Sequence, residues 1–266
     1  MGSDAPRPRS LSIAGSDSGG GAGIQADLKT FTALGVFGMT AITAVTVQNT
    51  TGVSGYEELS PANVAAQIRA VATDIGVDAA KTGMLASAAI VDAVAEAVAG
   101  SRIPNLVVDP VFVSKHGHRL LAEDAVGSLR TRILPLATLV TPNLPEASGL
   151  AGMPIGTRED MERAAGEILD LGPRAVLVKG GHLEEGPAAD LFVDGTSSAW
   201  LEAERISTPH THGTGCVLSS AICAHLARGE ELAAAVRLGK DFVTEAIRHA
   251  LALGGGIGPV DPAWGI

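Results

Sequence analysis

The segment from Thr211 to Cys216, Thr-His-Gly-Thr-Gly-Cys, has the residue types of an anion-binding helix start. Gly213 and Gly215 flank Thr214, and the residues that follow have the apolar spacing of a helix. The first backbone amides of a helix have no partner within it, so they can converge on an anion. A transferring phosphoryl group needs such fixed donors. The sequence therefore predicts an anion hole here, with an ordinary glycine-rich turn as the alternative.

Cys216 would lie in the first turn of that helix. The helix dipole lowers the pKa of a thiol in this position and favours the thiolate, which could then act as a base. The alternative is a buried, inert cysteine. Cys223 lies two turns further along the same face, and we interpret it as a buried residue of that kind.

Oxygen ligands and one cation follow other apolar runs of the chain. Asn143 and Glu146 are one helical turn apart, and they offer a carbonyl and a carboxylate suited to Mg²⁺ or to its bound waters. Asp109 follows a further apolar run, and we include it in the same predicted metal site. Lys179 ends the run Ala175–Val178 just before two glycines, which favours phosphate binding over an ordinary solvated lysine.

The glycine-rich loop Gly15–Gly23 matches neither of two common nucleotide motifs. A dinucleotide-binding loop needs an acidic residue about 20 positions on, and this chain has none between Asp27 and Glu57. A Walker loop needs a glycine before its lysine, and neither Lys29 nor Lys81 has one. The loop is therefore expected to serve a different small molecule.

Asp27 falls on the buried stripe of the helix that follows this loop, close to the helix start. Burying a carboxylate without a partner is costly, so we predict that Asp27 faces a ligand. A helix-dipole or capping partner is the alternative.

The elements that must position these residues are short apolar runs alternating with longer helical runs. This alternation is typical of a parallel sheet covered on both faces, in which ligands bind beyond the carboxyl ends of the strands. The predicted strands are Leu11–Ala14, Met39–Val47, Ala79–Lys81, Leu106–Val108, Thr138–Val140 and Ala175–Val178, with an edge hairpin of Leu191–Val193 and Ser198–Leu201. The predicted helices are Gly23–Leu34, Pro61–Thr73, Ala86–Ala99, Ala122–Leu134, Arg158–Leu171, Gly215–Arg228 and Glu231–Leu251.

The composition narrows the partners. The chain has 266 residues, 33 of them glycine, and a net charge of −10, which argues against broad binding of nucleic acid or of an anionic membrane. Two cysteines and no apolar leader or spanning segment predict a cytoplasmic protein. No linker-like run divides the chain, so we predict a flexible tail over residues 1–10 and one domain over 11–266.

Six motifs in order then identify a family resemblance: Leu11–Thr30, Ala44–Thr50, Lys81–Met84, Thr141–Ala147, Lys179–His182 and His212–Cys216. Together they closely resemble the hydroxymethylpyrimidine/phosphomethylpyrimidine kinases of thiamine biosynthesis, and the resemblance runs from Leu11 to the Gly256–Val260 segment. These kinases belong to the ribokinase-like superfamily. The resemblance implies an α/β fold with a central, mostly parallel sheet flanked by helices on both faces, and a homodimer.

The resemblance also implies roles for single residues. The pyrimidine pocket would be lined by Gly15, Ala22, Asp27, Gln48, Met84 and Val111. The amide of Gln48 offers a donor and an acceptor in one plane, as an aminopyrimidine requires. The resemblance assigns catalysis to Gly213, Thr214, Gly215 and Cys216. It assigns binding of the ATP phosphates to Lys179 and Thr211, and binding of Mg²⁺ with phosphate to Asn143 and Glu146. The superfamily usually has Asp in place of Cys216, so whether Cys216 abstracts the hydroxyl proton or only positions the hydroxyl stays open.

The expected activity is ATP- and Mg²⁺-dependent phosphorylation of 4-amino-5-hydroxymethyl-2-methylpyrimidine, and then of its monophosphate to the diphosphate. The alternatives are a pyridoxal or pyridoxine kinase of the same superfamily and a non-catalytic pyrimidine sensor. The polar segment Val113–Leu120 is the predicted lid.

Overall fold

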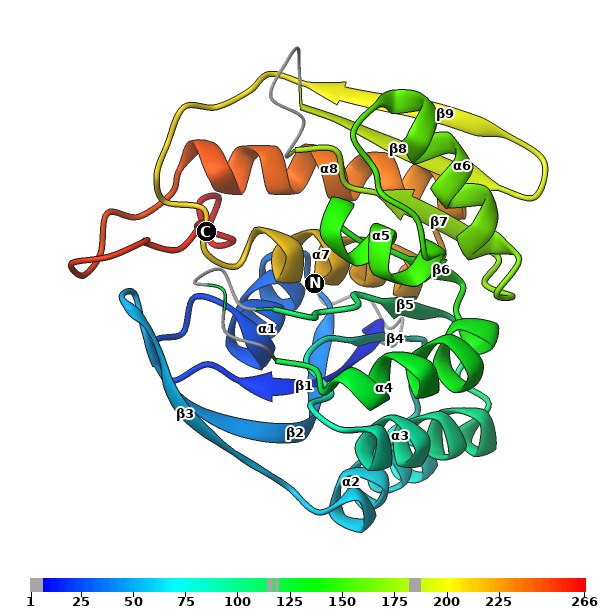
Figure 1. Cartoon of the computed structure of the whole chain (residues 1–266). Coiled ribbons are helices and arrows are strands. Elements are labelled where there is room, and N and C mark those ends of the chain that lie inside the picture. Colours follow the sequence, from blue (N-terminus) through cyan, green and yellow to red (C-terminus); the bar gives the residue numbers. More distant parts are fainter. Residues whose placement is uncertain (1–6, 114–116, 118–119, 182–187) are drawn as a thin grey trace.

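The strands of the protein join in one sheet. The computed structural model describes residues 7–113, 117, 120–181 and 188–266. Within these residues nine strands form a sheet in the order β3-β2-β1-β4-β5-β6-β7-β8-β9 (Figure 1). They are β1 (Arg9–Ser16), β2 (Phe37–Asn49), β3 (Gly52–Glu58), β4 (Ala79–Thr82), β5 (Leu106–Val108), β6 (Leu139–Val140), β7 (Ala175–Val178), β8 (Ala188–Asp194) and β9 (Ser198–Ala203). Along this order, each strand from β2 to β7 is parallel to the next. Strand β3 is antiparallel to β2, β8 to β7, and β9 to β8. The predicted mostly parallel sheet is confirmed.

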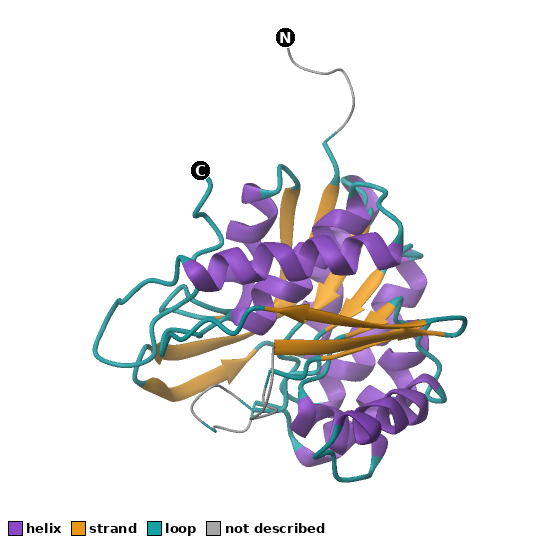
Figure 2. Ribbon diagram, turned by 90° about the horizontal axis from the view of Figure 1, so that it is seen from above, coloured by secondary structure: helices purple, strands orange, loops and turns teal. Residues whose placement is uncertain are grey.

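Helices cover both faces of this sheet (Figures 1 and 2). One face carries α1 (Gly23–Ala33), α7 (Thr214–Ala227) and α8 (Leu232–Arg248), whose apolar residues form one buried cluster with the sheet. The other face carries α2 (Pro61–Asp74), α3 (Ala88–Ser101), α4 (Glu123–Ser128), the π-helix η1 (Leu129–Ile133), the 3₁₀ turn η2 (Leu134–Leu136), α5 (Leu144–Ala151) and α6 (Arg158–Leu169). Each amphipathic element thus buries its apolar side against the sheet.

Three predicted elements differ from the structure for local reasons. The helix predicted over Ala122–Leu134 is instead α4, η1 and η2 in succession, and Pro135, which lacks an amide hydrogen and cannot continue an α-helix, lies in η2. The last helix ends at Arg248 rather than Leu251, whose amide bonds the Pro259 carbonyl oxygen at 2.8 Å. The predicted tail is shorter than ten residues, since β1 begins at Arg9, and residues 1–6 lie outside the described part of the chain.

Strand β3 and helix α5 were not predicted. β3 is largely exposed and holds one large apolar side chain beyond its valine, so it lacks the alternation that marks a half-buried strand. α5 is eight residues long and is preceded by Asn143, whose side chain caps it. An Asn followed three residues later by Glu is also the sequence pattern of a helix start, and that interpretation was the one overlooked.

The parallel strands bring their carboxyl ends to one edge of the sheet. At this edge β1 leads into α1, β6 leads into α5, and the segment after β9 leads into α7. This edge carries the residues predicted to do chemistry. Within the described residues, no helix is long and apolar enough to cross a membrane.

Candidate functional site

A cavity of about 630 Å³ opens at this edge of the sheet. It gathers predicted residues from seven segments that are far apart in sequence. Those that line it are Gly15, Ala22, Gln48, Met84, Asp109, Val111, Asn143, Glu146, Lys179, Thr211, Gly213, Thr214, Gly215 and Cys216. A volume of this size accommodates a small ring substrate together with phosphate groups.

The loop for which the sequence predicts an anion hole leads into α7 and lines the cavity. Gly213 is the N-cap of α7 with φ +82°, a left-handed conformation, and a β-carbon on it would overlap the Gly21 carbonyl oxygen. This contact joins the loop before α7 to the loop before α1. Gly215 lies in the first turn and faces the charged side of the cavity, because a β-carbon there would be 3.4 Å from both Asp109 Oδ2 and Lys179 Nζ.

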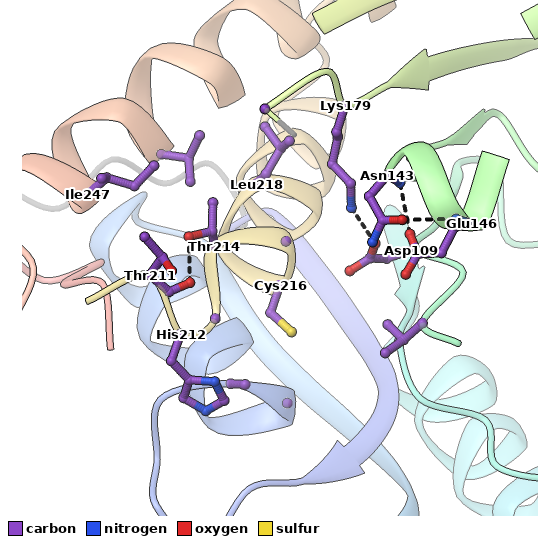
Figure 3. Close-up of a pocket in the computed structure, with 18 of the residues that line it drawn as sticks. Asp109, Asn143, Glu146, Lys179, Thr211, His212, Thr214, Cys216, Leu218 and Ile247 are labelled. Atoms are coloured by element: carbon purple, nitrogen blue, oxygen red, sulfur yellow. Dashed lines mark hydrogen bonds and ion pairs between the residues drawn. The ribbon is translucent and has the colours of Figure 1, made fainter. Parts of the chain in front are cut away.

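On the charged side of the cavity, Lys179 Nζ donates to Asp109 Oδ1 at 3.0 Å, and Glu146 lies close by (Figure 3). The Lys179 side chain is 16% exposed and that of Asp109 is 3% exposed. Burial would lower the pKa of Lys179, but the Asp109 and Glu146 carboxylates outweigh it and raise that pKa. Burial, reinforced by Asp109 and opposed by Lys179, raises the pKa of Glu146 to about 7. A further positive group would therefore stabilise both carboxylates.

Asn143 and Glu146 form a capping box at the start of α5. Asn143 Oδ1 accepts the Glu146 amide at 2.9 Å, and Glu146 Oε2 accepts the Asn143 amide at 2.8 Å. The box aims the Glu146 carboxylate at Asp109 and Lys179, as Figure 3 shows. These two residues therefore have a structural role besides the metal role predicted for them.

Asp17 and His212 form a network that the sequence analysis missed. His212 Nε2 lies 3.0 Å from Asp17 Oδ2 and 3.3 Å from Gln48 Nε2. Asp17 also accepts the amides of Gly19, Gly21 and Ala22. Burial would raise the pKa of Asp17, but the hydrogen bonds from His212 and from these amides hold it below its ordinary value. The network ties the loop before α1 to the loop before α7.

The prediction that Asp27 faces the ligand is wrong. Asp27 is absent from the cavity lining, and its side chain is 0% exposed. Its carboxylate accepts Ser12 Oγ at 2.5 Å, Ser220 Oγ at 2.6 Å and Lys81 Nζ at 3.1 Å on both oxygens. The cost of burying the charge is met by protein partners from β1, β4 and α7, which no local pattern around Asp27 reveals.

The prediction of a lowered thiol pKa at Cys216 is also wrong. Cys216 lies in the first turn of α7 as predicted, but burial raises the pKa of its thiol to about 12. The helix dipole is outweighed by the loss of solvent around the sulfur. Cys223 is fully buried, and burial raises its thiol pKa to about 12 as well.

Apolar side chains of α7 and α8 form a further wall of the cavity. They are Leu218 on α7 and Val243 and Ile247 on α8, and Figure 3 labels Leu218 and Ile247. Their spacing in the sequence is that of ordinary core positions on a helix, so it does not indicate a function. Their place in the cavity depends on how α7 and α8 pack.

Comparison with known proteins decides the family. A sequence profile described as phosphomethylpyrimidine kinase matches residues 17–261. The hydroxymethylpyrimidine/phosphomethylpyrimidine kinase of Streptomyces coelicolor is 55% identical over 97% of this chain and 96% of its own. The chain belongs to the phosphomethylpyrimidine kinase family. Its ribokinase-like fold and its membership in a kinase family follow.

Solved structures agree with this placement in the phosphomethylpyrimidine kinase family. The phosphomethylpyrimidine kinase of Clostridium difficile 630 superimposes with a TM-score of 0.82 at 46% identity, covering 91% of this chain and all of the other. The pyridoxal kinase of Bacillus subtilis, solved as an ADP complex, superimposes with a TM-score of 0.90 at 40% identity, covering 97% and 98%. The predicted lid Val113–Leu120 falls largely outside the residues that the structure describes.

Proposed function

We propose that this protein transfers the γ-phosphoryl group of ATP to the hydroxymethyl group of 4-amino-5-hydroxymethyl-2-methylpyrimidine, and then to the resulting monophosphate, in thiamine biosynthesis. The observation that carries this proposal is the juxtaposition at Gly215. Its backbone lies against Lys179 and Asp109, so amide donors, a cation and carboxylates converge on one spot of the cavity. Such a spot suits a transferring phosphoryl group.

The two substrates would approach this spot from opposite sides. Gln48, Met84, Val111, Gly15 and Ala22 line the pyrimidine side, where Gln48 supplies hydrogen bonds to ring nitrogen and exocyclic amine. Leu218, Val243 and Ile247 line the other side, which receives the nucleotide base, with Lys179 and Thr211 at its phosphates. The acceptor oxygen forms a bond to the γ-phosphorus as the bond from that phosphorus to ADP breaks.

The oxygen donors near Glu146 fit Mg²⁺. This ion commonly takes one or two protein carboxylates and completes its shell with substrate phosphates and water. Asp109 and Glu146 supply such carboxylates, with the Asn143 amide beside them. No group of three or more His, Cys, Asp or Glu able to hold a metal occurs among the residues described. When bound, Mg²⁺ would neutralise phosphate charge.

The direct test is phosphate transfer by the purified protein. With Mg-ATP and the hydroxymethylpyrimidine, we expect ADP release and, by mass spectrometry, the monophosphate followed by the diphosphate. The Lys179→Met variant, prepared in parallel, controls for contaminating kinases. Absence of ADP release with both the alcohol and its monophosphate would refute the proposal.

A pyridoxal kinase activity is the second candidate, since the Bacillus subtilis pyridoxal kinase superimposes so closely. Comparing kcat/KM for the pyrimidine, pyridoxal and pyridoxine separates the two, and the pyrimidine is expected to give the highest value.

A homodimer and a cytoplasmic location stay part of the proposal. The exposed Val45 and Val47 side chains on β2 support self-association, which light scattering of the purified protein tests.

A further inference from the structure

The Gln48 side chain lies between two polar neighbours that constrain how its amide is turned. Its amide nitrogen lies 3.3 Å from His212 Nε2, and its amide oxygen lies 3.2 Å from Thr46 Oγ1. His212 immediately precedes Gly213, the N-cap of α7 (Figure 3). Both ends of the amide therefore have a fixed neighbour, and the hydrogens on those neighbours decide which rotamer is preferred.

Asp17 determines where His212 carries a hydrogen. Asp17 Oδ2 lies 3.0 Å from His212 Nε2 and also accepts the amides of Gly21 and Ala22 at 3.0 and 2.8 Å. A carboxylate oxygen with these contacts is an acceptor, so the imidazole nitrogen must donate a hydrogen to it. Asp17 and His212 are only 3% and 7% exposed, so little water can replace this contact. His212 Nε2 therefore has no lone pair to offer the amide of Gln48.

The Thr46 hydroxyl leads to the same conclusion at the other end of the amide. Thr46 Oγ1 donates to the Ser16 carbonyl oxygen at 2.8 Å, a shorter contact than the one to Gln48. A hydroxyl has one hydrogen, so Thr46 meets Gln48 as an acceptor. Turning the amide over brings its oxygen to the N–H of His212 and its nitrogen to Thr46 Oγ1. Both contacts are then between a donor and an acceptor, whereas in the opposite rotamer two N–H groups and two oxygens face one another.

The backbone of His212 is fixed, so the imidazole ring can impose this choice. Its amide donates to the Gly258 carbonyl oxygen at 3.1 Å, and its carbonyl oxygen accepts the Val260 amide at 3.0 Å. The ring packs against Gly21, where a β-carbon would be 2.6 Å from His212 Cδ2. The ring therefore has little freedom to move away from Gln48, and the rotation of the Gln48 amide is what remains to be set.

The rotamer matters because the two candidate rings carry different groups in the same order. In the pyrimidine, the amine lies on the carbon next to the one that bears the hydroxymethyl group, and a ring nitrogen follows it. Under the proposed function the hydroxymethyl group reaches the loop before α7, so the amine lies on the His212 side of Gln48. The amide oxygen accepts from the amine there, and the amide nitrogen donates to the ring nitrogen. Pyridoxal has an aldehyde oxygen where the pyrimidine has its amine, so two acceptors would meet.

We propose that His212 is a positioning residue that determines specificity, because it holds the Gln48 amide in the rotamer that favours the aminopyrimidine over pyridoxal. Asp17 keeps a hydrogen on His212 Nε2, and His212 keeps the amide oxygen towards the reacting end of the ring. This inference deepens the proposed function and rests on it, since it states how the same site selects its ring.

The test compares ring selectivity in matched variants. In His212→Met the Gln48 amide is free to turn, so the ratio of kcat/KM for the pyrimidine to that for pyridoxal should fall about tenfold or more. The dissociation constant of the pyrimidine, measured by calorimetry without ATP, should rise in parallel. His212→Gln places an amide N–H near the position of Nε2 and should restore most of the selectivity. His249→Met, at an exposed histidine that stacks on Trp264, is the control and should leave the ratio unchanged.

A double-mutant cycle with Gln48→Met shows whether His212 acts through the amide. In the Gln48→Met background, His212→Met should change the ratio little further, because no amide is left to orient. An equal loss of selectivity with and without Gln48 would overturn the proposal.

The hydrogen on His212 Nε2 can be observed in the wild-type protein without substrate, by long-range proton–nitrogen NMR spectra of the ring. We expect Nε2 to carry a hydrogen, and a bare Nε2 would overturn the proposal even if His212→Met failed to fold. Wild-type protein that binds neither ring contradicts the proposed function. Wild-type protein that prefers the pyrimidine, with the same ratio in folded His212→Met, contradicts this inference alone.

Discussion

Two buried Lys–Asp pairs, with their lysines at the end of β4 and just after β7, differ in their access to a ligand. The Asp27 carboxylate accepts two hydroxyls besides Lys81, and neither side chain reaches solvent. Lys179 and Asp109 hold one another at 3.0 Å at the edge of the cavity, where the Lys179 side chain is 16% exposed. The closed pair can act only through its neighbours, whereas the open pair can exchange partners with a ligand.

The largest effect should come from breaking the closed pair. Lys81→Met leaves the Asp27 charge buried without a cation, which costs about 3–5 kcal/mol of unfolding free energy. The Lys81→Met/Asp27→Asn double variant should recover most of that loss, since it leaves no unpaired charge. Urea denaturation of both variants measures the difference. Equal stability of the two would show that Asp27 and Lys81 are not energetically coupled.

Breaking the open pair should affect turnover instead of stability. Lys179→Met removes the cation that we propose to bind the transferring phosphoryl group, and loss of one such preorganised group typically lowers kcat by about 10²–10³-fold. Its unfolding free energy should fall less than that of Lys81→Met, because Asp109 lies at the cavity, where water can solvate it. Steady-state kinetics and urea denaturation measure both. Arg163→Met, at an exposed cation on α6, is the control. A turnover loss no larger than the control's would contradict an open, ligand-directed pair.

The contrast between the pairs also marks what the sequence could predict. The parallel sheet, the helix start after Gly213 and the place of Lys179 at the cavity were predictable because each depends on a short local pattern: an apolar run, a glycine-rich helix start, or a charge that ends a strand. Asp27 carries a similar local signal, a charge within an apolar stripe. Its partners come from Ser12, Lys81 and Ser220, which only the tertiary fold brings to it.

The errors have the same origin. The helix start at Cys216 was predicted, but the thiol pKa depends on burial by elements distant in sequence. Asp17 is likewise an acidic residue in a glycine-rich loop, and no residue near it in sequence indicates that His212 is its partner. Local patterns thus indicate which residues are unusual, and packing decides whether each of them turns toward the ligand or into the core.

Alanine substitutions at Gly213 and Gly215 should have smaller effects than loss of either lysine, and they test the same contrast between turnover and stability. Gly215→Ala places a methyl group 3.4 Å from Asp109 Oδ2 and Lys179 Nζ, an ordinary contact in the free protein that occupies the space of a phosphoryl group. We expect kcat to fall about tenfold or more with stability unchanged, because the methyl displaces the transition state from its donors. Gly213→Ala strains a left-handed residue by about 1–2 kcal/mol and also overlaps the Gly21 carbonyl, so it should lower the melting temperature. Equal thermal losses in both variants would contradict the assignment of Gly215 to the open side.

The smallest effect concerns Asp17 and His212. They are intermediate between the closed and the open pair, because both residues are buried and both line the cavity. The pKa of Asp17 is lower in the folded protein than its ordinary value. The stability it contributes is therefore fully present above the unfolded-state pKa, near 4, and is lost as the pH falls through the lower folded-state value. Asp17→Asn removes this dependence, so unfolding free energy measured from pH 6 to pH 3 should fall less steeply than in the wild type. Asp160→Asn removes a half-buried surface carboxylate in the first turn of α6 that also has a lowered pKa, and it provides the matched slope for a surface group. If Asp17→Asn leaves the acid slope as steep as in the wild type, the link between the two loops does not depend on the Asp17 charge.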